Sequence, residues 1–158
     1  MNSITTVIAV LALIGSAIVG GVFFAFSSFI MKALARVSPE AGIAAMQSIN
    51  VVVINPTFLG TFMGTAVISL VLAGFAITDW ETSSSPWLLA GALFYLIGTF
   101  LVTGLGNVPL NNQLAAVAAA DSSAVAVWQH YLDRWTMLNT VRTTAAVAAS
   151  LSLTIGLL

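Results

Sequence analysis

A long apolar stretch near the start of the chain sets the first constraint on its fold. Residues 4–30 contain no charged side chain and no proline. As an α-helix, this stretch would be about 40 Å long at ~1.5 Å per residue, whereas the hydrocarbon core of a bilayer is about 30 Å thick. The stretch also lacks the basic region that begins a signal peptide. We therefore expect a retained transmembrane helix over residues 4–30.

The composition extends this expectation to an integral membrane protein. Of the 158 residues, 59% are hydrophobic and 6% are charged, whereas soluble domains carry about 25% charged residues. Such a chain cannot cover a water-facing surface, so we expect the lipid bilayer as its main partner. Four lysines and arginines cannot form the basic stripe that binds a phosphate backbone, which argues against nucleic-acid binding. The chain has no cysteine, which excludes disulfides and thiolate metal sites.

Three further stretches have the length and apolarity of membrane spans, at about residues 51–77, 86–106 and 138–158. We expect shorter helices over residues 39–50, where Ser38 precedes a proline and an acidic residue, and 109–119. Gly104 and Gly106 are expected to close the third span. The predicted fold is therefore an all-α integral membrane four-helix bundle, one transmembrane domain over residues 1–158, with short interfacial helices in the first and third loops.

The most informative pattern lies on the last helix, which we expect to extend N-terminally from about residue 122. Side chains at i, i+3, i+7, i+11 and i+14 share one face of a 3.6-residue helix; here they are Trp128, Tyr131, Trp135, Asn139 and Arg142. If Leu158 lies at the membrane surface, Arg142 lies about 24 Å from it, within or at the edge of the hydrocarbon core. An arginine at that depth should face the bundle interior and find partners there.

The charged residues predict the arrangement of the loops. Four spans place both termini on one side, together with Asp79 and Glu81, and place the basic residues on the other side: Lys32, Arg36, Arg134 and Arg142. By the positive-inside rule the basic loops are cytoplasmic and both termini are outside. We expect the inner (plasma) membrane of a bacterium as the location.

Polar and aromatic residues from several segments should meet at the basic side. We expect several asparagines to lie at the same depth in the membrane as Arg142, at the basic side, namely Asn55, Asn107, Asn111 and Asn139. The run Phe23–Phe29, which includes Phe26, either lines a ligand cavity or faces lipid. Gly60 and Gly64 form a GxxxG pair, which packs helices within the bundle or between the subunits of a homo-oligomer.

The titratable groups allow several kinds of chemistry. His130 and Asp133 are three residues apart, but one histidine and no cysteine make a metal site weakly supported. A haem with two axial histidines would need a second histidine from another subunit. His130 is a candidate general base, oriented by Asp133, or else a surface residue. Arg142 either binds an anion or carbonyl, or ties the last helix to the loop around Asn107 and Asn111.

Several motifs together resemble a known family. They are G-G-V-F-F-A-F-S-S-F-I-M (20–31), M-Q-S-I-N (46–50), N-P-x-F (55–58), N-V-P-L-N-N (107–112) and W-x6-W-x3-N-x2-R-T (128–143). They resemble the four-helix membrane family that includes fungal anthrone oxygenases, whose bacterial members were filed as a domain of unknown function. The resemblance covers nearly the whole chain. It implies oxidation of anthrones to anthraquinones by O₂ without metal or flavin.

Such a reaction needs a site that holds a flat hydrophobic aromatic molecule, stabilises its oxyanion and supplies a base. As hypotheses, the ring would be held by Trp128, Tyr131, Trp135 and the cluster around Phe26. The oxyanion would be met by Asn107, Asn111, Asn139, Asn55 and Arg142, and His130 or Asp133 would be the base. The alternative is a non-enzymatic membrane module that binds a quinone, haem or lipid, or an accessory subunit of a membrane complex.

Overall fold

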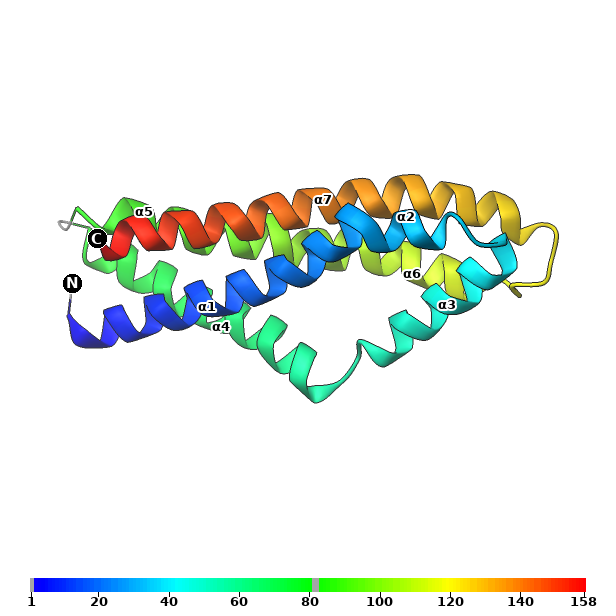
Figure 1. Ribbon diagram of the computed structural model, residues 1–158. Coiled ribbons are helices and arrows are strands. Elements are labelled where there is room, and N and C mark those ends of the chain that lie inside the picture. Colours follow the sequence, from blue (N-terminus) through cyan, green and yellow to red (C-terminus); the bar gives the residue numbers. More distant parts are fainter. Residues whose placement is uncertain (1, 81–82) are drawn as a thin grey trace.

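The computed structural model describes residues 2–80 and 83–158, and the elements it contains there are all helices (Figure 1). Four continuous helical segments are long and apolar enough to cross a membrane: Ser3–Leu34, Pro56–Thr78, Ser85–Ala115 and Ala124–Leu157. The predicted all-α fold with four helices long and apolar enough to span a membrane is thereby confirmed. Glu81, which was expected on the same side as the termini, lies outside the described residues.

The first segment runs through α1 (Ser3–Ala25), the π-helical η1 (Phe26–Ile30) and α2 (Met31–Leu34). It begins where the Asn2 side chain accepts a hydrogen bond from the backbone N–H of Thr5, at 2.8 Å. A separate short helix follows, α3 (Pro39–Val52), and Ser38 caps it as predicted by accepting from the N–H of Ala41.

The second membrane-spanning helix begins later than predicted. It is α4 (Pro56–Thr78), and α3 continues to Val52 instead of ending near residue 50. The break falls at residues 53–55 because Asn55 is in an extended conformation and its side chain accepts from the N–H of Phe58, at 3.0 Å. Pro56 then occupies the first turn of α4, where its missing N–H costs nothing.

The third segment is longer than predicted and does not end at Gly106. It comprises α5 (Ser85–Leu93), η2 (Phe94–Leu101), η3 (Thr103–Asn107) and α6 (Val108–Ala115) in one continuous helix. In η3 the N–H of Val108 donates to the carbonyl of Thr103, five residues back. This wider π-helical turn accommodates Pro109, whose ring and missing N–H disrupt a regular α-helix. The predicted helix over 109–119 is therefore α6, an extension of the span that ends at Ala115.

The last helix, α7 (Ala124–Leu157), runs along the whole molecule (Figure 1). Its C-terminal half packs against α1, α5 and η2, and its N-terminal half packs against α3 and α6. The N-terminal half therefore covers a second small core with those two helices. Both termini lie at the opposite end of the molecule (Figure 1).

Small residues let α7 approach its neighbours closely. A Cβ atom on Gly20 would lie 3.1 Å from the Ala146 side chain, and one on Gly98 would lie 2.4 Å from that of Ala145. By contrast, a Cβ on Gly60 or Gly64 would meet no atom within 4 Å. The GxxxG pair therefore does not pack helices within this chain, and only its role between subunits remains a prediction.

Candidate functional site

The buried face of α7 carries a column of stacked aromatic rings. Tyr131 lies between Trp128 and Trp135, with ring centroids 5.7 Å and 5.8 Å apart and interplanar angles of 14° and 20°. All three side chains are buried. Phe26 of η1 contacts the last ring of the column, at 5.6 Å from the centroid of Trp135.

Asn111 of α6 holds this column in place. Its Oδ1 atom accepts two hydrogen bonds of 2.8 Å, one from the hydroxyl of Tyr131 and one from the Nε1–H of Trp135. Asn50 of α3 donates to the same tyrosine oxygen at 3.4 Å, and Asn107 donates to the backbone carbonyl of Trp135 at 3.2 Å. Asn111 and Asn50 therefore fix the rings of α7, and Asn107 fixes the backbone beside them.

Two turns after Trp135, the side chain of Arg142 is only 4% exposed. Its Nη1–H donates to the Thr103 hydroxyl oxygen at 3.1 Å, and its Nη2–H donates to Asn139 Oδ1 at 2.7 Å. The guanidinium carbon lies 4.0 Å from the ring centroid of Phe23 and 5.1 Å from that of Trp135. The guanidinium is thus held between two aromatic rings, which suits a cation.

The partners of the guanidinium are themselves held firmly. Asn139 donates from Nδ2 to the Phe23 carbonyl and to the Ser27 hydroxyl, both at 2.7 Å, which leaves its Oδ1 to face the arginine. Thr103 donates its own hydroxyl hydrogen to the carbonyl of Thr99 at 2.7 Å, so its oxygen is free to accept. The guanidinium is therefore oriented by α1, η1 and η3 together.

Arg142 carries a buried positive charge that the described residues do not neutralise. Within residues 2–80 and 83–158 its two hydrogen-bonding side chains, Thr103 and Asn139, are both neutral, and its Nε has no partner. A charge buried without a counterion costs several kcal/mol, roughly, even after relaxation. The site is therefore poised to gain stability from an anionic or strongly accepting group.

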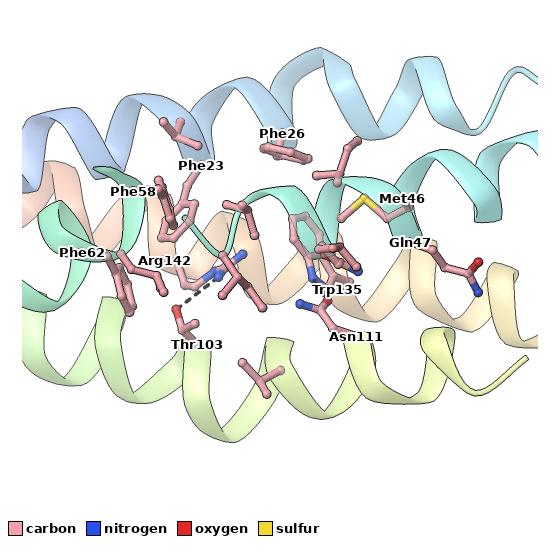
Figure 2. A pocket seen from close by; sticks show the side chains of 18 of the residues that line it. Phe23, Phe26, Met46, Gln47, Phe58, Phe62, Thr103, Asn111, Trp135 and Arg142 are labelled. Carbon is pink, nitrogen blue, oxygen red and sulfur yellow. Dashed lines mark hydrogen bonds between the residues drawn. The ribbon is translucent and has the colours of Figure 1, made fainter. Parts of the chain in front are cut away.

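A cavity of about 460 Å³ opens in front of Arg142 (Figure 2). Figure 2 shows Phe23, Phe58 and Phe62 on one side of the guanidinium and Trp135 with Asn111 on the other. The cavity is lined by Val22, Phe23, Phe26, Met46, Gln47, Ile49, Asn50, Val51, Val53, Ile54, Phe58, Leu59, Phe62, Met63, Thr103, Val108, Asn111, Asn112, Ala115, Trp135 and Arg142. The cavity is thus largely apolar and aromatic, with a few polar groups in its lining.

The structure brings most of the predicted site residues together. Four of them line the cavity, namely Phe26, Asn111, Trp135 and Arg142. Four more are buried beside it and hold these residues in place: Asn107, Trp128, Tyr131 and Asn139. The run Phe23–Phe29 divides, because Phe23 and Phe26 line the cavity while Phe24 and Phe29 are exposed.

Three predicted site residues do not line this cavity, and their predicted roles stay predictions. His130 and Asp133 are exposed on α7, and neither lines the cavity. The reason is helical geometry: Trp128 and Tyr131 occupy the buried face, so positions two residues after each of them point outward. Asn55 does not line the cavity either, because its side chain caps α4.

Part of the cavity wall consists of residues that were not predicted as site residues. Met46 and Gln47 come from α3, Phe58 and Phe62 from α4, and Thr103 from η3. The spacing of the two phenylalanines places them on one face of a helix. Nothing in the sequence showed that this face turns toward Arg142, because that depends on the angle between α3 and α4.

Comparison with known proteins gives one match. The sequence model of the family described as anthrone oxygenase matches residues 56–152, which is more than half of the chain. The matched range contains Thr103, Asn111, Trp135 and Arg142, and α1 and α3 lie before it. No curated protein and no solved structure matched the chain.

Proposed function

Since the chain belongs to the anthrone oxygenase family, we propose that it is a membrane-embedded enzyme that oxidises a flat polycyclic ketone or phenol with O₂. The observation that carries the proposal is the buried guanidinium of Arg142 at the inner end of an aromatic cavity. Its hydrogen-bonding partners among the described residues are neutral, so its charge is available to a ligand.

The cavity suits a fused-ring molecule. Its volume of about 460 Å³ lies within the range of about 300–1,000 Å³ typical of small-molecule sites. The rings of Phe23, Phe58 and Phe62 on one side and Trp135 on the other offer flat apolar surfaces. A planar ligand would lie among these rings with one oxygen directed at Arg142.

The chemistry follows from the acidity of an anthrone. Its methylene carbon lies between two aromatic rings and opposite the carbonyl in the central ring. Loss of one methylene proton therefore gives a conjugated anion whose negative charge rests mainly on the carbonyl oxygen. Arg142 would stabilise that oxyanion through its charge and its remaining N–H groups. The electron-rich carbon then transfers electrons to O₂ and forms a carbon–oxygen bond. Loss of water from the resulting peroxide gives the quinone carbonyl, so one oxygen atom enters the product and the other leaves as water.

The proton acceptor in this proposal is water. None of the residues that line the cavity carries a carboxylate or an imidazole, and His130 and Asp133 are exposed outside it. A guanidinium beside the carbonyl oxygen lowers the pKa of the methylene group, because an opposite charge favours the ionised form. Arg142 would therefore promote both ionisation and the later electron transfer. We further propose that the reaction needs no metal or flavin, as the family resemblance implies.

The rival function is binding of a quinone without turnover. The same observation favours it, since Arg142 and Asn111 would also meet the carbonyl oxygens of a quinone. A haem is less compatible with the cavity, because no histidine lines it.

The test is an oxygen-electrode assay on the purified protein with anthrone as the substrate. We expect uptake of one O₂ for each anthraquinone formed, and label from ¹⁸O₂ in the new carbonyl. The 10,10-dimethyl derivative, which has no methylene proton to lose, is the matched control and should consume none. Tight anthraquinone binding without any O₂ uptake above the protein-free rate would reject the enzyme and support the binding module.

A further inference from the structure

We propose that the ligand reaches this cavity sideways from the lipid bilayer, through an opening between α4 and the η3–α6 part of the third segment. The proposal rests on the proposed function only for the nature of the ligand, a flat hydrophobic molecule. The route itself rests on which residues form the rim of the cavity and on what surrounds them.

The rim of the opening is exposed and mostly apolar. On α4 it is formed by Leu59 and Met63, and the Met63 side chain is 47% exposed although it lines the cavity. Opposite them, Val108 of α6 is 41% exposed and also lines the cavity. The exposed side chains of Val51 and Ile54 complete the rim where α3 meets α4. Asn112 of α6 is also exposed and lines the cavity, so the rim carries one polar side chain, but none of these rim residues is charged.

The rim continues the surfaces that would face lipid. Along α4, Met63 is followed on the same face by exposed Val67 and Leu70, four and seven residues later. Along the third segment, Val108 is preceded by exposed Leu105 and Leu101. Since both helices are candidate membrane spans, lipid chains would cover these two stripes and reach the opening between them.

The packing of the helices leaves this gap. α4 packs along α1, α5 and η2, whereas α6 packs on α3 and α7. Figure 1 shows α3 and α4 converging on their link at residues 53–55, which stands away from α7. The two walls of the opening therefore belong to helices that diverge at this end.

The depth of the opening agrees with access from lipid. Met63 lies seven residues into α4, about 10 Å along the helix from Pro56. The helix as a whole is about 35 Å long, against a hydrocarbon core of about 30 Å. The opening thus lies near the middle of one leaflet, inside the hydrocarbon core, where a hydrophobic fused-ring molecule would dissolve.

The medium at the opening can be tested without any ligand. The chain has no cysteine, so a nitroxide label can be placed on single variants Met63→Cys and Val108→Cys in phospholipid vesicles. Power-saturation EPR should show stronger collisions with O₂ than with a water-soluble nickel chelate at both positions. Asp133→Cys, exposed on α7, is the control and should show the reverse. Stronger collisions with the nickel chelate at positions 63 and 108 would overturn the proposal.

The route can be tested by narrowing the opening. Met63→Trp should slow the association of radiolabelled anthraquinone with the protein in vesicles severalfold, whereas Val67→Trp, one turn further along the same exposed face, should leave it unchanged. Equal association rates for the two variants would overturn the lateral route. Because anthraquinone is the proposed product, its association can be measured without any turnover. If the unsubstituted protein binds anthraquinone but takes up no O₂ with anthrone, the oxygenase proposal is rejected and the lateral route is not.

Discussion

Replacing Arg142 by methionine is expected to abolish most turnover while leaving the protein folded. A guanidinium has five N–H groups, of which one is bound by Thr103 and one by Asn139. If two of the remaining groups bind the oxyanion, each contributes about 1.5–3 kcal/mol as a charge-assisted hydrogen bond. Their loss amounts to about 3–6 kcal/mol, or about 100- to 10,000-fold in kcat/KM at ~1.4 kcal/mol per factor of ten.

The same change should not weaken the fold. Arg142→Met removes a buried charge that no described carboxylate compensates. The folded state then no longer bears the desolvation cost of that charge, which is roughly several kcal/mol. It leaves Asn139 Oδ1 without its donor, at a cost of about 1–3 kcal/mol. We therefore expect the Tm in detergent to stay the same or to rise while turnover falls.

The assay is O₂ uptake with anthrone, compared with thermal unfolding followed by circular dichroism. Arg134→Met is the matched control, because Arg134 lies on the same helix but is exposed, and it should keep full kcat/KM. If Arg142→Met folded normally and kept kcat/KM within severalfold of the unsubstituted protein, the guanidinium would not be the oxyanion partner. A large fall in Tm would instead show that its charge is compensated structurally.

Four other changes test further parts of the structure. Asn111→Leu leaves the Tyr131 hydroxyl and the Trp135 Nε1–H without their shared acceptor, so it should lower the free energy of unfolding by about 2 kcal/mol or more. Denaturant unfolding in micelles measures this value, and an unchanged value would refute the shared acceptor. Gly98→Ala should cost about 1–3 kcal/mol in the same measurement because its new methyl group meets Ala145 at 2.4 Å. Gly64→Ala should instead be neutral or stabilising by up to about 1 kcal/mol, and a loss there would indicate packing against a second subunit. His130→Ala should keep full O₂ uptake, since the imidazole is exposed and outside the cavity; a tenfold or greater loss would reinstate it as the base.

The periodicity of α7 predicted the buried face of this helix correctly. The five side chains from Trp128 to Arg142 at helical spacing are all buried, because a single amphipathic helix dictates its own inward face. The same periodicity places His130 and Asp133 off that face. Their chemistry makes them candidates for a base, but the helical spacing turns both side chains outward.

The predicted boundaries failed where local signals competed. Gly104 and Gly106 indicated a helix end, but the wider turn of η3 absorbs both the glycines and Pro109. The start of α4 moved to Pro56 because Asn55 caps it. The cavity itself could not be predicted from the sequence, since its far wall depends on how α3 and α4 diverge, and no single segment encodes that angle.

The π-helical segments let the third membrane span hold extra residues without turning the helix that follows. Each wide turn takes up one residue more than a regular α-helix needs, as in η3, where the N–H of Val108 reaches five residues back. Deleting one residue of η3 would therefore restore regular winding there and leave Asn111 facing the rings of α7. Deleting or inserting one residue of α6 between Val108 and Asn111, where no extra residue is held, would instead rotate the Asn111 side chain by about 100° and take it away from those rings.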